Sequence, residues 1–145
     1  MPRYLRLSHG FTVAELLVLT GLLMGLMTIA VPNFLSWLPT LRLSSAARQV
    51  ATDLQMVRMK AISQNTKFRL NFVTSTSYVV EKDNSGTFTT ESGPFSLPEG
   101  ITTATGATSE FQPRGTANAA STITLSNGNE TRQVEIIAVG RVKIL

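Results

Sequence analysis

The architecture of this 145-residue chain is decided by the stretch Phe11–Val31, which reads FTVAELLVLTGLLMGLMTIAV. The stretch is almost wholly apolar, and Glu15 is its only charged residue. As an α-helix it would span about 32 Å at the usual rise per residue, which is close to the thickness of a bilayer's hydrocarbon core. The sequence therefore predicts one membrane-spanning helix near the N-terminus.

The residues before this helix form a short basic leader, MPRYLRLSHG, with Arg3 and Arg6. A cleaved secretory signal peptide is the obvious alternative, but it would have a shorter apolar core and a small-x-small cleavage site. Here the apolar run is longer, and no Ala-x-Ala follows it. A single-pass anchor fits better, with the basic flank in the cytoplasm and the C-terminus outside.

The composition narrows the class of protein further. The chain is 43% hydrophobic and 15% charged, has a net charge of +4 and contains no cysteine. A soluble domain has about 25% charged residues, so a purely cytosolic protein is disfavoured. The hydrophobic content argues against intrinsic disorder, and the absence of cysteine excludes a disulfide framework and a Cys-ligated metal.

A second helical pattern follows the apolar run, from Leu41 to about Asn65. Pro32 and Pro39 lie between the two patterns and, because they lack a backbone donor, are expected to kink or locally open a helix. We therefore predict one long, kinked helix with a membrane or filament-core half, 11–39, and an amphipathic half, 40–66. The apolar face of the second half repeats every three or four residues and consists of Leu43, Ala46, Val50, Leu54, Val57 and Ala61.

Beyond Lys67 the apolar residues alternate with polar ones, which indicates half-buried antiparallel strands. The alternation is clear at Phe68, Leu70 and Phe72; at Tyr78 and Val80; at Ile123 and Leu125; at Val134 and Ile136; and at Val142 and Ile144. Asn84-Ser85-Gly86 and Asn127-Gly128 are turn signals, and the second predicts a hairpin. Residues 74–109 are rich in Ser and Thr and predict one strand followed by a long, poorly regular loop. The expected fold is α+β, with the long helix packed on an antiparallel β-sheet domain over 67–145.

The segment Gly10-Phe11-Thr12-Val13-Ala14-Glu15-Leu16-Leu17 resembles the processing site of type IV prepilins and of type II secretion pseudopilins. Pro32 falls where that family has its helix-kinking proline. Three further segments resemble the FimT/GspH group: Leu43 to Ile62; the Phe111-Gln112-Pro113-Arg114-Gly115 element; and Thr122–Leu125 with the closing Gly140–Ile144.

This resemblance implies that residues 1–10 are a leader, which a prepilin peptidase/N-methyltransferase removes between Gly10 and Phe11 before methylating the Phe11 amine. It also implies that Glu15 is neutralised by the free Phe11 amine of a neighbouring subunit, and that Glu15 and Pro32 serve assembly. The alternative for Glu15 is a solvated or protonated carboxylate near the membrane interface. The implied partners are other pilins or pseudopilins, an inner-membrane assembly platform and the lipid bilayer. The implied location is the bacterial inner membrane, with the C-terminal domain in the periplasm, and then the pilus or pseudopilus.

Basic residues in the C-terminal strands suggest a second role. In an extended strand Arg141 and Lys143 project to one face while Val142 and Ile144 point inward, so the two cations could bind two phosphates. Some FimT-type proteins are linked to DNA uptake through a Gly-Arg-x-Arg-like element; here Lys143 replaces the last arginine and loses its planar fork. The candidate site for double-stranded DNA consists of Arg114, Arg132, Arg141 and Lys143. The alternative is a solvated strand face.

An enzyme is not expected. The only histidine, His9, lies in the predicted leader, so no Ser-His-Asp or Cys-His arrangement forms in the mature chain. No catalytic residue, metal site or cofactor is predicted. Three functions remain. The first is a structural subunit that assembles into or primes a type IV pilus, or a GspH-type pseudopilin of a type II secretion system. The second is a minor pilin whose basic C-terminal face binds DNA during natural transformation, and the third is a monomeric anchored protein.

Overall fold

The computed structural model describes residues 10–145, so the leader prediction for residues 1–9 lies outside the described residues. The chain forms two compact units that divide between Trp37 and Leu38. The order of elements is one long helix followed by seven strands.

The helix α1 runs from Val13 to Ser63 and is 51 residues long. Its backbone stays helical through Pro32 and Pro39, so neither proline opens the helix locally, and the kink, the other predicted effect, stays a prediction. Each proline removes a single backbone donor. The hydrogen bonds of the flanking turns are enough to carry the helix across both positions.

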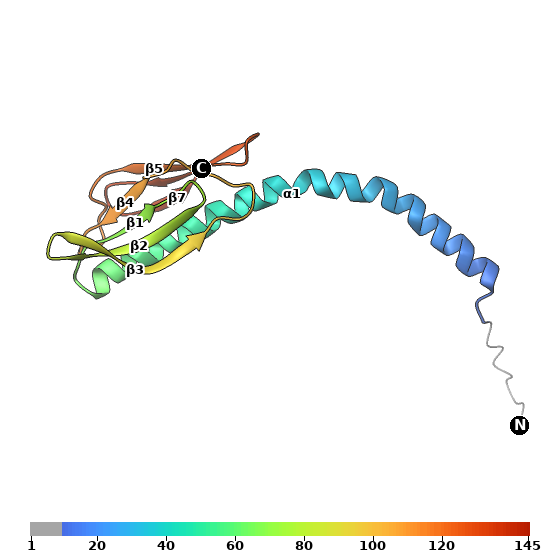
Figure 1. Cartoon of the computed structure of the whole chain (residues 1–145), viewed down its shortest axis with the longest axis horizontal. Coiled ribbons are helices and arrows are strands. Elements are labelled where there is room, and N and C mark those ends of the chain that lie inside the picture. Colours follow the sequence, from blue (N-terminus) through green and yellow to red (C-terminus); the bar gives the residue numbers. More distant parts are fainter. Residues whose placement is uncertain (1–9) are drawn as a thin grey trace, which may run out of the picture. The chain divides into compact units, whose positions relative to one another are not determined.

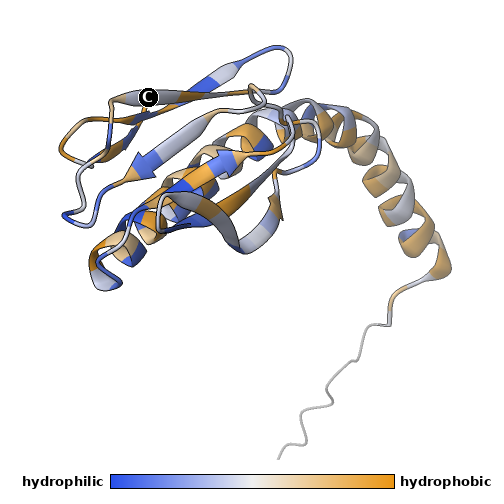
Figure 2. Cartoon of the chain, turned by 60° about the vertical axis from the view of Figure 1, so that its left-hand side comes forward, coloured by the Kyte–Doolittle hydropathy of each residue, from blue (hydrophilic) through white to orange (hydrophobic). Residues whose placement is uncertain are grey.

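The apolar side chains of the first part of α1, up to Trp37, are exposed on all sides of the helix. Most of this part of the ribbon is orange, the colour of hydrophobic residues, in Figure 2. Its length and composition are sufficient to cross a membrane, and none of the most apolar stretch is buried within the chain. A helix that is apolar on every side needs lipid or other helices around it.

The second part of α1 packs on the strands (Figure 1). Every residue of the predicted apolar face is buried there, from Leu43 to Ala61, together with Ala47 and Ala51. The small alanines let the helix lie close to the sheets, and the aromatic side chains Phe68, Phe72, Tyr78 and Phe111 fill the core below it. The amphipathic prediction for this half is confirmed.

Four strands form the first antiparallel sheet, in the order β3-β2-β1-β4. Their bounds are β1 Phe68–Phe72, β2 Ser77–Asn84, β3 Thr87–Ser96 and β4 Thr108–Phe111. The predicted turn at Asn84-Ser85-Gly86 joins β2 to β3, with positive φ angles at Ser85 and Gly86.

Three strands form the second antiparallel sheet, in the order β5-β6-β7. Their bounds are β5 Ser121–Ser126, β6 Thr131–Ile136 and β7 Val142–Ile144. The hairpin predicted at Asn127-Gly128 joins β5 to β6, and the Asn127 side chain accepts hydrogen bonds from the Asn129 and Glu130 amides. β7 is an edge strand, paired on one side only.

The reading of residues 74–109 as one strand and an irregular loop is wrong, because this segment also contains β3 and the start of β4. No residue of β3 is fully buried. An edge strand with both faces partly in solvent does not need alternating apolar residues, and its threonines favour extended backbone. The alternation that predicted β1, β2, β5, β6 and β7 is therefore missing from β3.

Candidate functional sites

Thr12 caps the N-terminal end of α1. Its side-chain oxygen accepts a hydrogen bond of 3.2 Å from the Glu15 amide, so Thr12 and Glu15 occupy the N-cap and N3 positions of a Thr-x-x-Glu start. Glu15 is the acidic residue of the first turn, where negative charge complements the helix dipole. Gly10, Phe11 and Glu15 are all exposed in the single chain. The site predicted for processing and assembly is therefore accessible, and Glu15 also has a local role at the helix start.

The outer face of the second sheet carries Arg141 and Lys143. Lys143 lies opposite Glu135 in the β6–β7 register. Arg141, Lys143 and Glu135 line one shallow hollow of about 190 Å³ together with Ile137. The two cations thus share a face, but the half-buried carboxylate of Glu135 lines the same hollow and reduces the positive potential there.

The prediction that Val142 and Ile144 point inward is correct only in part. Val142 is half-buried against the core, whereas Ile144 is 40% exposed. Ile144 lies on the α1 side of the sheet but beyond the end of the packed core.

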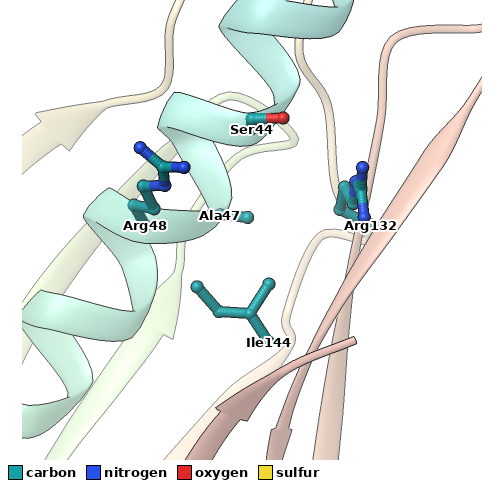
Figure 3. Close-up of a pocket in the computed structure, with 5 residues that line it drawn as sticks. All are labelled: Ser44, Ala47, Arg48, Arg132 and Ile144. Carbon is teal, nitrogen blue, oxygen red and sulfur yellow. The ribbon is translucent and has the colours of Figure 1, made fainter.

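Arg132 does not belong to the same face as Lys143. It has the same parity along β6 as the buried Val134 and Ile136, so it lies on the α1 side of the sheet. There it lines a separate hollow of about 150 Å³ with Ser44, Ala47, Arg48 and Ile144. Figure 3 shows Arg48 and Arg132 on opposite sides of this hollow with Ser44 between them.

Arg114 is exposed in the loop that follows β4. The next residue, Gly115, approaches the turn before β7 so closely that a Cβ on Gly140 would lie 1.9 Å from the Gly115 carbonyl oxygen. The loop that carries Arg114 and the turn that leads into Arg141 are therefore neighbours. The contact joins two segments that the sequence singled out separately.

Arg58 is a residue that sequence reasoning did not select. Its Nε donates a 2.8 Å hydrogen bond to the Gly115 carbonyl, and it lines a hollow of about 220 Å³ with Gln55, Met59, Arg141 and Val142. One guanidinium on α1 thus holds the Gly115 loop next to Arg141. Its partner is a backbone atom far along the chain, so no sequence pattern marks it.

The basic residues divide into paired and unpaired groups. Ion pairs join Arg42 to Glu99, Lys60 to Glu91, Lys67 to Glu110 and Arg69 to Glu81. Over residues 10–145, no ion pair involves Arg48, Arg58, Lys82, Arg114, Arg132, Arg141 or Lys143. The unpaired cations include all four residues of the predicted DNA site.

A half-buried polar cluster links α1 to the first sheet. The Tyr78 hydroxyl donates to the Asp53 carboxylate and accepts a 3.0 Å hydrogen bond from Gln49. Burial raises the pKa of the Tyr78 hydroxyl well above its usual value, and Asp53 raises this pKa further. The cluster fixes helix and sheet to each other, and the hydroxyl stays protonated at neutral pH.

Within the described part of the chain, no group of three His, Cys, Asp or Glu side chains is close enough to hold a metal ion. The chemistry available at the surfaces above is charge and hydrogen bonding.

Solved structures of minor pilins and pseudopilins share this fold of one long helix on antiparallel sheets, and two of them serve as examples. The type IV minor pilin FimU of Pseudomonas aeruginosa superposes with a TM-score of 0.61 at 18% identity, covering 71% of this chain and 87% of that one. The minor pseudopilin EpsH from the type II secretion system of Vibrio cholerae superposes with a TM-score of 0.58 at 13% identity, covering 72% and 96%. The comparison with curated protein sequences gave no significant match. The fold is therefore that of the minor pilins and pseudopilins.

The family model described as type II transport protein GspH matches residues 46–140. Because this match covers more than half of the chain, the chain belongs to the GspH family, and the resemblance to the FimT/GspH group is confirmed. Families of this kind are structural subunits, and the two neighbours come from two different machines.

Proposed function

We propose that this chain is a subunit anchored in the bacterial inner membrane, which assembles into a pilus-like filament or primes one. The observation that carries the proposal is the exposed apolar first part of α1, in which Glu15 is the only charged residue before Arg42. The same apolar surface is stable in lipid and, after assembly, against the helices of other subunits. The periplasmic domain, 40–145, is displayed outward, and its role is structural.

Processing supplies the partner for Glu15 in this proposal. A prepilin peptidase/N-methyltransferase cleaves between Gly10 and Phe11 and methylates the new amine. That amine is the cation that Glu15 of the adjacent subunit needs, since an isolated carboxylate in a membrane helix is costly. The assembly platform and the other pilins then determine where the subunit enters the filament. Pro32 adjusts the helix for packing.

The test separates the assembly role of Glu15 from its local role at the helix start. Glu15→Gln removes the charge but keeps a good residue at N3, whereas Thr12→Ala removes the cap but keeps the charge. Expressed with its own filament machinery, the Glu15→Gln chain should be cleaved and remain in the membrane without entering the sheared filament fraction. Thr12→Ala should still assemble. Assembly of Glu15→Gln at the normal level would overturn the proposal.

A second function is favoured by the unpaired Arg141 and Lys143 on one sheet face. The proposal is that the displayed domain binds the phosphate backbone of double-stranded DNA, as a minor pilin of natural transformation would. The full chain in a neutral detergent should bind labelled duplex DNA with a strong salt dependence. Arg141→Gln with Lys143→Gln should remove this binding. Absence of binding at low salt would leave the alternative, a structural GspH-type pseudopilin of a type II secretion system.

A further inference from the structure

Arg132 was predicted to bind DNA together with Arg141 and Lys143, but it lines a separate hollow with Ser44 and Arg48. We propose that this hollow is a second phosphate-binding site, on the opposite side of the edge strand β7 from Arg141 and Lys143. The DNA backbone would then be held on both sides of β7. This inference rests on the proposed DNA binding and deepens it by assigning a second subsite.

The chemistry of the hollow suits an anion. Arg48 and Arg132 are both exposed, and neither forms an ion pair with a described residue. Two guanidinium groups around one small hollow repel each other unless an anion lies between them. Each presents a planar fork of donors that matches phosphate oxygens, and the Ser44 hydroxyl supplies a further donor (Figure 3).

The volume of the hollow is sufficient for a tetrahedral anion. This volume is about 150 Å³, and Ala47 and Ile144 form the apolar part of the hollow. A hollow needs only about 10–15 Å³ of this kind of volume to hold one water molecule, so there is room for a phosphate group and several waters.

The hollow lies beside β7, the same strand that carries the first basic face, formed by Arg141 and Lys143. Three hollows touch residues 137–144: the outer one with Arg141 and Lys143, one shared by Arg58 and Arg141, and the one with Arg48 and Arg132. Each contains at least one cation that forms no ion pair with a described residue. A polyanion such as DNA needs several cationic sites in a row, whereas a single carboxylate from a neighbouring subunit needs only one. The three hollows therefore favour DNA.

The free edge of β7 adds backbone donors between these hollows. In the antiparallel register, Lys143 faces Glu135, and the Leu145 amide donates to the Gln133 carbonyl. The alternation of an antiparallel ladder then directs the amides of Val142 and Ile144 away from β6. Backbone amides of this kind are common phosphate ligands.

One carboxylate lies near the hollow. Glu130 precedes Arg132 by two residues and accepts a 3.2 Å hydrogen bond from Thr40. It forms no ion pair with Arg132 or Arg48 among the described contacts. Glu130 therefore weakens the site by its field but does not occupy it, and Glu130→Gln should tighten DNA binding.

The experiment compares three double variants of the full chain in a neutral detergent, titrated with labelled duplex DNA over a range of salt concentrations. Arg48→Gln with Arg132→Gln removes the proposed subsite. Arg42→Gln with Lys60→Gln is the matched control, because it removes the same charge from cations that already pair with Glu99 and Glu91. Arg141→Gln with Lys143→Gln removes the first basic face.

The subsite variant should bind DNA about tenfold more weakly near physiological salt, and its plot of log affinity against log salt should be shallower by about 0.9 per lost contact. The control should lose much less affinity and keep its slope. Wild-type affinity and slope in the subsite variant would overturn this inference. If that variant also failed to assemble, Arg48 and Arg132 would instead be assigned to a contact between subunits. Absence of DNA binding by the unaltered chain overturns the proposed DNA-binding function itself, and with it this inference.

Discussion

The backbone at Gly140 touches the carbonyl oxygen of Gly115, and a Cβ at Gly140 would lie only 1.9 Å from that oxygen. Gly140 has a φ of +80°, which also disfavours any side chain. The Gly115 carbonyl is the acceptor for Arg58. One crowded point thus joins α1, the loop after β4 and the turn before β7, and it determines where Arg114 and Arg141 emerge.

Gly140→Ala should destabilise the domain by more than about 2 kcal/mol, because it combines a backbone clash with left-handed strain. Gly128→Ala is the matched control: its φ is +90°, but nothing lies within 4 Å of the added Cβ. That variant should lose only about 1 kcal/mol from strain. Urea unfolding of both chains, followed by near-UV circular dichroism, measures the difference. Equal losses would mean that the contact with Gly115 yields without cost.

Arg58→Gln should lower the free energy of unfolding by about 1–2 kcal/mol, since it removes a half-buried hydrogen bond from a charged donor. It should also weaken DNA binding, because the Gly115 loop is no longer held beside Arg141. We expect the salt dependence of binding to stay close to that of the unaltered chain, since Arg58 acts on the position of other cations. A slope reduced by about one unit would instead make Arg58 a direct phosphate ligand.

The buried face of α1 was predictable because helical spacing is a local property, and Leu43, Val50 and Ala61 follow it without exception. The hairpin at Asn127-Gly128 was predictable for the same reason. β3 was not, because an exposed edge strand does not need the alternation that reveals a half-buried one.

The arrangement of the basic residues on the two faces of the second sheet could be predicted only in part. The period-two rule that places Arg141 with Lys143 also places Arg132 with the buried Val134, so the separation of Arg132 from Lys143 was available from the sequence. The proximity of Arg132 to Arg48 could not be predicted, because it depends on how α1 packs against the second sheet. The contact between Gly115 and Gly140 is also tertiary and leaves no local pattern.

Tyr78 should make stability depend on pH in the alkaline range. Its folded pKa is raised by burial and by Asp53, so folding favours the protonated hydroxyl. This contribution is complete below the unfolded pKa near 10 and is lost as the pH rises above it, by about 1.4 kcal/mol per pH unit. Tyr78→Phe should remove that dependence and cost about 1 kcal/mol at neutral pH, since Asp53 loses a donor. Urea unfolding from pH 8 to 11 compares the two chains, and parallel curves would contradict the assigned role.

Glu135→Gln should strengthen DNA binding, by roughly threefold at low salt and less at high salt. Glu135 lies opposite Lys143 and shares the outer hollow with Arg141, so its carboxylate competes with phosphate for both cations. Glu91→Gln is the matched control, because it removes the same charge on β3, the opposite edge strand of the other sheet. An equal gain in both variants would show only a change in net charge. A gain confined to Glu135→Gln, and lost again when Lys143→Gln is added, would assign the competition to the hollow between β6 and β7.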